Sequence, residues 1–454
     1  MSENLTKRYD DNNYAIYVPS LQSGYAQFAV KKDKDVRDGD LPAGFHMRDL
    51  NFLDPRSKLW SCGYTLYSSG QFDKSQIRQL DMVRDRKRGE SIVIGDSGGF
   101  QLGQGVIKNA KEQKDLQELA IDANKLYAQW HDVGFRKRTL RWLDVYTDYA
   151  MTLDMVLWGI GTKSSVLRNL SVEQAIDLTV DNNRFFSDHR GQVVGGGTKF
   201  LNVLQDSEEH VGSGEAWYQA VKDFDFEGWS FGGTTTRLDN LLRWCHRLLR
   251  ENKLGKNVEW LHVLGNSPPV FSVVYTAIQQ ALCKATGHQI TISYDSSSPH
   301  QGAGKQRAMY KIPKFSTDLK KSWVMGNKRI DQNIQLALDD IKKKPLPHSS
   351  PVSKYFTLND LNYHEDLYRE NFVDSLSEHI MVNHNIYVYH RAALDACDLV
   401  FKKPHFDPQV PMYFYEFLAL MSDFFQASDC EVFLRDRENA KLLSILGGYK
   451  LETE

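Results

Sequence analysis

The stretch SIVIGDSGGFQ, residues 91–101, contains the pattern from which the fold can be argued. Its apolar run, residues 92–94, is typical of a buried strand. Two glycines, Gly98 and Gly99, end the run, and glycine lets a flat ligand approach the backbone closely. Asp96 and Ser97 stand between this apolar run and the two glycines, so a carboxylate and a hydroxyl follow the carboxyl end of a predicted strand. In parallel α/β proteins that end carries the chemistry.

The same alternation of apolar strands and helical segments continues along the chain. We predict strands at residues 14–18, 59–67, 92–94, 148–157, 200–204, 226–231, 260–264 and 289–294, and helices at 76–86, 111–130, 171–186, 236–251 and 268–285. About seven or eight strand–helix units precede residue 300, close to the roughly 250 residues that a (β/α)8 barrel uses. The pattern therefore predicts an α/β fold, a (β/α)8 TIM barrel, with a doubly wound open sheet as the alternative.

We expect three regions along the 454 residues. Residues 1–45 lead into the barrel, residues 46–330 form it, and residues 331–454 form a mostly helical C-terminal extension. No GxGxxG or GxxxxGK[ST] motif follows a predicted strand, which argues against a dinucleotide or P-loop site.

Composition limits the partners and the compartment. The net charge is −2, so binding of nucleic acid must come from a local patch. The five cysteines are scattered without CxxC spacing, which favours a reducing compartment such as the cytoplasm. The polar N-terminus does not resemble a signal peptide, and no run of about 20 apolar residues predicts a membrane span.

One such patch follows the last predicted strand. Between Lys305 and Lys344 there are eleven Lys or Arg residues and only four Asp residues. Aromatic residues interleave with them, which is consistent with contacts to a phosphate backbone and to bases. The alternative is a solvated, charged surface. The candidates for phosphate contacts are Lys305, Arg307, Lys311 and Lys314, and those for base stacking are Tyr310, Phe315 and Trp323.

Polar residues or glycines follow five of the predicted strands. They are Asp96 with Ser97, Asp154, Gln205, Gly232 with Gly233, and Asp295. A carboxylate can accept from the N1–H and 2-amino group of guanine, while an amide or a backbone N–H donates to O6. The remaining carboxylates are then free for chemistry at a glycosidic carbon. Simpler roles exist as well: Asp96, Ser97 or Asp154 could cap a turn or a helix, Gln205 could lie on the surface, and Asp295 could form an Asx turn.

Six motifs in this order resemble the tRNA-guanine transglycosylase superfamily over roughly residues 50–390. They are DSGGFQ (96–101), AMTLD (150–154), NVLQD (202–206), GWSFGG (228–233), WLHVLG (260–265) and ISYDSSSP (292–299). The resemblance implies a (β/α)8 barrel that exchanges guanine for a 7-deazaguanine without a cofactor. It makes Asp295 the nucleophile and Asp96 the general acid and base. The positions that it assigns to base binding are Ser97, Phe100, Asp154, Gln205, Gly232, Gly233 and His262, the last at a place where the family has methionine.

The chain also departs from that family. The family carries a zinc subdomain with a CxCxxC run, whereas the corresponding PHSSPVSKY (347–355) has no cysteine. His348, Ser350 and Ser353 stand there instead, and His384-Asn385 resembles the final ligand position. One or two histidines without thiolates make a poor tetrahedral site, so we predict no structural zinc.

These departures and the long C-terminus resemble the DNA-modifying, DpdA-like branch of the superfamily, found in phages and bacteria. The resemblance implies replacement of guanine in DNA by a free base such as 7-cyano-7-deazaguanine, in the host cytoplasm if a phage encodes the protein. Action on tRNA is the alternative. A further alternative is a non-catalytic subunit that binds nucleic acid, but such a subunit would need neither Asp96 nor Asp295.

Overall fold

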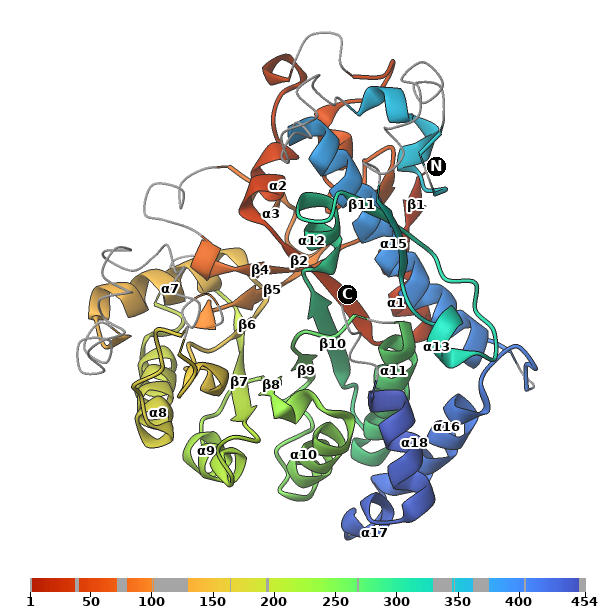
Figure 1. Cartoon of the computed structure of the whole chain (residues 1–454). Coiled ribbons are helices and arrows are strands. Elements are labelled where there is room, and N and C mark those ends of the chain that lie inside the picture. Colours follow the sequence, from red (N-terminus) through yellow and green to blue (C-terminus); the bar gives the residue numbers. More distant parts are fainter. Residues whose placement is uncertain are drawn as a thin grey trace.

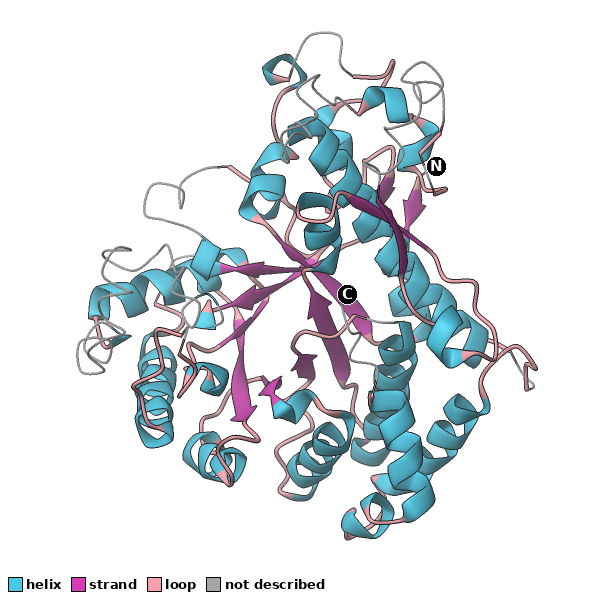
Figure 2. Ribbon diagram, viewed as in Figure 1, coloured by secondary structure: helices cyan, strands magenta, loops and turns pink. Residues whose placement is uncertain are grey.

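The computed structural model (Figure 1) describes residues 2–36, 41–71, 80–99, 101, 130–163, 165–192, 196–267, 269–329, 345–346, 348–361, 375–403 and 406–448. Eight parallel strands, drawn in magenta in Figure 2 and labelled in Figure 1, close into a barrel in the order β10-β2-β4-β5-β6-β7-β8-β9. They are β2 (Ile16–Leu21), β4 (Tyr64–Ser68), β5 (Ile92–Asp96), β6 (Tyr149–Met151), β7 (Lys199–Asp206), β8 (Gly228–Gly233), β9 (Trp260–Val263) and β10 (Thr291–Ser296). The barrel confirms the predicted fold class, and its closure excludes an open sheet.

Helices surround the barrel and follow its strands. They are α7 (Val133–Tyr146), α8 (Val172–His189), α9 (Ser213–Val221), α10 (Leu238–Arg250) and α11 (Pro269–Thr286). Those predicted at 171–186, 236–251 and 268–285 are confirmed, whereas α7 and α9 were not predicted. Helix α8 begins with a capping box, because Ser171 and Gln174 each accept a hydrogen bond from the backbone N–H of the other. The helix predicted at 111–130 lies outside the described residues except for Trp130. Of the one predicted at 76–86, the described part contains α3 (Met82–Asp85).

The barrel starts before the expected boundary at residue 46. Strand β2 lies within the segment expected only to lead into the barrel, and it pairs with two barrel strands. Its Ile16 is aligned with Ser293 of β10, and its Ser20 with Leu66 of β4. Closure of the barrel therefore depends on the first 21 residues of the chain.

Residues beyond 296 complete the outer layer. The long helix α15 (Ser375–Phe401) packs against α11, β2 and the short helix α12 (Ser298–Gly304). The remaining elements are β1 (Glu3–Asn4), α1 (Leu5–Asn12), α2 (Ser23–Phe28), β3 (Trp60–Ser61), β11 (Ala308–Lys311), α13 (Leu319–Ser322), β12 (Gly326–Arg329), α16 (Met412–Phe424), α17 (Glu431–Leu434) and α18 (Arg437–Gly447). Single turns of 3₁₀ helix lie at Asp33–Asp35, Met47–Leu50, Ser69–Gln71, Leu157–Gly159, Thr234–Thr236, Val352–Lys354 and Leu358–Asp360. The described part of the C-terminal region is mostly helical, as expected.

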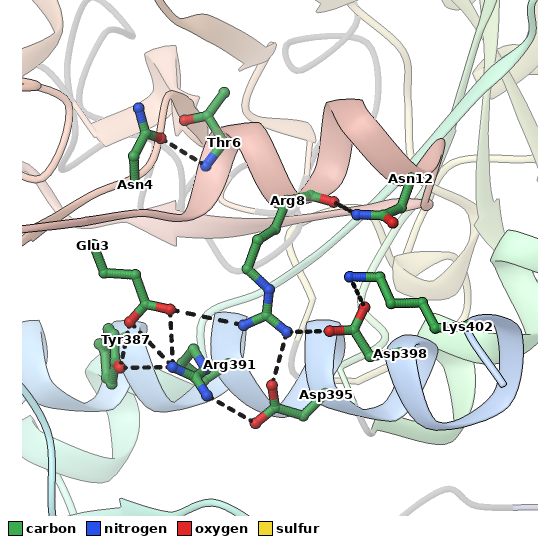
Figure 3. Close-up of polar contacts among 10 residues, drawn as sticks. All are labelled: Glu3, Asn4, Thr6, Arg8, Asn12, Tyr387, Arg391, Asp395, Asp398 and Lys402. Atoms are coloured by element: carbon green, nitrogen blue, oxygen red, sulfur yellow. Dashed lines mark hydrogen bonds and ion pairs between the residues drawn. The ribbon is translucent and has the colours of Figure 1, made fainter.

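A network of charges joins the N-terminal segment to α15 (Figure 3). Arg8 of α1 lies 2.9 Å from Asp395 and 2.7 Å from Asp398, both on α15. Arg391 of the same helix lies 2.8 Å from Glu3. These side chains are about one-quarter to one-third exposed, so water screens the pairs only in part. The network holds the segment that precedes β2 against the helix that covers it.

Within the described ranges, no helix has the length and apolar character needed to cross a membrane.

Candidate active site

A cavity of about 760 Å³ opens at the carboxyl ends of the barrel strands. Polar residues at the ends of five strands line it, as the order of motifs predicts. They are Asp96 of β5, Asp154 after β6, Gln205 of β7, Gly232 and Gly233 of β8, and Asp295 of β10. Three carboxylates and one carboxamide thus face a common space.

Asp154 and Gln205 form a pair on one side of the cavity. The Gln205 Nε2 donates to Asp154 Oδ2 at 2.9 Å. Burial raises the pKa of Asp154 to about 7, the Gln205 hydrogen bond opposes this rise, and the charge of Asp96 adds to it. A side chain at Gly232 would displace the Gln205 amide, because its Cβ would lie 2.6 Å from the Gln205 Nε2. Glycine at this position therefore leaves space for the Gln205 amide that pairs with Asp154.

Asp96 is the second carboxylate of the cavity. Its Oδ1 accepts a hydrogen bond from the backbone N–H of Gly98 at 3.0 Å. Burial raises its pKa; hydrogen bonds from Gly98 and Ser68 oppose the rise, and the negative charge of Asp295 adds to it. A carboxyl group with a raised pKa keeps its proton to higher pH, which suits a general acid.

Asp295 is the third carboxylate, and two donors lie beside one of its oxygens. The backbone N–H of Gly265 donates to Oδ1 at 2.9 Å, and the Nε2 of His262 lies 3.5 Å from the same oxygen. Asp295 is 8 % exposed, and this exposure is toward the cavity. Its position suits attack on an electrophilic carbon held above the barrel.

Two residues expected to touch a bound base do not line the cavity. The buried hydroxyl of Ser97 donates to the backbone carbonyl of Thr152 at 3.0 Å, so it links the ends of β5 and β6. Successive residues of an extended chain point in opposite directions, so Asp96 faces the cavity and Ser97 does not. His262 is fully buried beneath the cavity wall and cannot contact a ligand. Phe100 lies outside the described residues.

The expected nucleic-acid-binding residues divide into three cases. Lys305 lines the rim of the cavity. Arg307 has its guanidinium 3.2 Å from Glu378 of α15, so it is already paired. Lys311 and Lys314 are exposed but do not line the cavity.

The stacking role expected of the aromatic residues is wrong for two of the three. Trp323 is fully buried, with ring centroids 4.6 Å from Phe315 and 4.5 Å from Phe414. Tyr310 is also buried, with its ring edge against Tyr389. Tyr389 is on α15 and Phe414 is on α16, so both rings belong to the core that these C-terminal helices complete.

The stretch that resembles a zinc subdomain is held by hydrogen bonds. His384 Nδ1 lies 2.7 Å from Ser350 Oγ, and His384 Nε2 lies 2.9 Å from the carbonyl of Tyr310. Asn385 donates to the carbonyls of Pro299 and Ala308. Both ring nitrogens of His384 are thus occupied. In the ranges given above, no group of three or more His, Cys, Asp or Glu residues could hold a metal, so the residues do not fit the zinc site of that family.

Sequence reasoning missed one wall of the cavity. Ser20 of β2 lines it with Gln22, Ser23 and Gly24, which follow that strand, and with Gln101 and the 37 % exposed Trp158. The signal was present, because polar residues follow β2 as they follow the other strands, but that strand was assigned outside the barrel. Apolar contacts come from Met151, Val156, Val203 and Leu264. Apolar walls with a few convergent polar groups suit a flat ring with a polar edge.

No protein-family model matches the chain, and no curated protein matches it. The cavity itself presents three features: the Asp154–Gln205 pair for the polar edge of a ring, the Asp96 carboxyl group with a raised pKa, and the Asp295 carboxylate that faces the same space.

Proposed function

We propose that the protein is a base-exchange transglycosylase that replaces guanine in DNA with a 7-deazaguanine. The observation that carries the proposal is the meeting of Asp96 and Asp295 in one cavity with the Asp154–Gln205 pair. The first two would perform chemistry at a glycosidic carbon, and the pair would recognise the base. The order of six sequence motifs supports the same activity.

The base would lie with its polar edge toward Asp154 and Gln205. The Asp154 carboxylate accepts from N1–H and from the 2-amino group of guanine, while the Gln205 amide donates to O6. A 7-deazaguanine presents the same edge, so one pocket serves both the leaving and the entering base. Both bases compete for this pocket, which requires that guanine leave before the new base enters.

The reaction would run as a double displacement. Asp295 attacks C1′, the C1′–N9 bond breaks, and guanine takes the electron pair together with a proton from Asp96. The sugar is now bound covalently to Asp295. Asp96 next takes the N9 proton of the 7-deazaguanine, and N9 attacks C1′. The electron pair of the sugar–oxygen bond returns to Asp295, and two inversions retain the configuration.

The target nucleotide must be flipped out or single-stranded, because the reacting carbon of a stacked base is out of reach. Lys305 at the rim is suited to a phosphate beside that nucleotide. The preference for DNA rests on the resemblance in sequence, since phosphate contacts do not distinguish DNA from RNA.

The first experiment measures the release and uptake of radiolabelled guanine. Asp295→Ala and Asp295→Asn should abolish exchange, because neither side chain is an effective nucleophile. Exchange by Asp188→Ala, on the exposed face of α8, should equal that of the wild type. Near-normal exchange by either Asp295 variant would refute the assigned nucleophile, and binding of nucleic acid without exchange by the wild type would indicate a non-catalytic subunit.

The second experiment identifies the acceptor. The enzyme is incubated with 7-cyano-7-deazaguanine and with guanine-containing DNA, single- or double-stranded, or unmodified tRNA. The nucleic acid is digested, and its nucleosides are identified by mass spectrometry. A modified deoxynucleoside is expected. A modified ribonucleoside from tRNA, with none from either form of DNA, would assign the activity to tRNA instead.

A further inference from the structure

His262 has a buried polar atom without a partner. The side chain points inward from β9 and is fully buried. Its Nε2 makes no hydrogen bond to any described residue, and it lies 3.5 Å from Oδ1 of Asp295. Buried polar atoms are nearly always hydrogen-bonded, so an exception beside a reactive carboxylate calls for an explanation. A catalytic hydrogen bond that is long without substrate can tighten in the complex.

A chain of hydrogen bonds fixes where the imidazole proton lies. Trp260 Nε1 donates to Ser293 Oγ at 2.8 Å, and the indole nitrogen can only donate. The Ser293 hydroxyl proton can then go to His262 Nδ1 at 2.8 Å or to the carbonyl of Leu261 at 3.5 Å. If Nδ1 instead donated to Oγ, Nε2 would carry no proton and would face the carboxylate oxygen of Asp295 at 3.5 Å lone pair to lone pair, which disfavours that tautomer. The neutral ring therefore carries its proton on Nε2, on the side of Asp295.

We infer that His262 is a positioning residue for Asp295, an inference that rests on the proposed function. Gly265 N–H and His262 Nε2–H both approach Oδ1. Among the described residues, none makes a hydrogen bond to Oδ2. Oδ1 is therefore the anchored oxygen, and Oδ2 is the oxygen that attacks C1′.

This arrangement acts most strongly when the covalent intermediate breaks down. After the attack, Oδ2 is bonded to C1′ and Oδ1 is the carbonyl oxygen of an ester. When the entering base attacks C1′, the C1′–Oδ2 bond breaks, and its electron pair makes the Asp295 carboxylate negative again. A donor to Oδ1 stabilises that charge, so Asp295 becomes a better leaving group. Loss of the donor should slow the second step more than the first, and the intermediate should accumulate.

The test compares steady-state exchange of guanine with the fraction of enzyme that carries a covalent sugar, measured by intact-protein mass spectrometry after an acid quench. His262→Leu should lower kcat about 10- to 100-fold, the range expected for loss of a hydrogen bond to a charged group. KM for guanine should change less than about threefold, because His262 does not touch the cavity. The covalent fraction should rise above that of the wild type.

Two further variants keep the result interpretable. His262→Gln retains an N–H donor and should recover part of kcat and lower the covalent fraction again. Ser293→Ala keeps the imidazole but frees its tautomer, and it should change both quantities in the same direction as His262→Leu, by less. His246→Leu removes another buried histidine, on α10, and should leave both quantities unchanged.

The outcomes separate the inference from the proposed function. A His262→Leu enzyme with kcat within threefold of the wild type, or with reduced kcat but no rise in the covalent fraction, overturns the inference. So does an equal loss in His246→Leu. If Asp295→Ala exchanges guanine normally, the proposed function fails and the inference fails with it. If Asp295→Ala is inactive while His262→Leu is fully active, only the inference fails.

Discussion

Replacing Asp154 by asparagine should make the protein more stable in alkaline solution while removing its ability to bind a base. Asp154 is 5 % exposed, and burial raises its pKa to about 7. In the unfolded chain an aspartate titrates near pH 4, as free aspartate does. The folded protein therefore holds the proton more tightly than the unfolded chain between about pH 4 and pH 7.

The sign and size of the effect follow from this difference. Where the folded state binds more protons, the free energy of unfolding falls as pH rises, so the wild type loses stability between about pH 4 and pH 7. A difference of about three pKa units, at about 1.4 kcal/mol each, sets an upper limit of about 4 kcal/mol. Asparagine does not ionise. At pH 8 the Asp154→Asn protein should thus be about 2–4 kcal/mol more stable than the wild type, and near pH 4 the two should differ by less than about 1 kcal/mol.

Urea unfolding at about pH 4, 6, 7 and 8 measures this difference, and equilibrium dialysis with radiolabelled guanine at about pH 8 measures binding. Guanine binding should be lost, because the amide cannot accept from both N1–H and the 2-amino group. Asp188→Asn, which removes an exposed carboxylate, should unfold like the wild type at every pH. A stability difference that does not change with pH, or a wild type that is the more stable protein at pH 8, would refute the assignment of a buried, proton-binding Asp154.

Three further predictions concern packing and metal content. Gly232→Ala should displace the Gln205 amide and weaken guanine binding at least about tenfold. Gly197→Ala, whose Cβ would meet open space, should bind guanine with the affinity of the wild type. Equal affinities of the two variants for guanine would contradict the steric argument. Trp323→Ala should lower the free energy of unfolding by about 3–5 kcal/mol and leave guanine affinity unchanged, and a loss of less than about 1 kcal/mol would show that the ring is not part of the core. Both ring nitrogens of His384 are hydrogen-bonded, so treatment with a chelator should not change the melting temperature, and metal analysis should find far less than one zinc per chain. Stoichiometric zinc would contradict this prediction.

The barrel could be predicted because a strand buried on both faces has a continuous apolar run, and a polar residue directly after it marks the carboxyl end. This local rule located Asp96, Gln205 and Asp295. It could not assign the direction of each side chain, so Ser97 was expected in the cavity although it faces away. His262, which only the family resemblance assigned to base binding, lies beneath the cavity wall. Direction depends on the closure of the barrel, which brings together residues far apart in the sequence.

Long-range packing explains the errors in the basic segment. Charges around Trp323 suggested an exposed ring, yet its partner Phe414 lies 91 positions further along the chain. Arg307 is likewise paired with Glu378, on a helix that begins well after the basic segment. A local pattern of lysines and aromatic residues does not distinguish a surface from a core edge when the covering helix comes later in the chain.

Strand β2 has a consequence for synthesis on the ribosome. It pairs with β10, which begins at Thr291, 270 residues after β2 ends at Leu21. At about 5–20 residues per second, the ribosome needs roughly 15 to 50 seconds to deliver that partner. During this interval the nascent chain carries an apolar strand with one unpaired edge, which is open to association with other chains. The helix α15, which packs against β2, emerges later still. Barrel closure therefore comes after most of the chain has left the ribosome, and we expect the nascent chain to need chaperones mainly before closure.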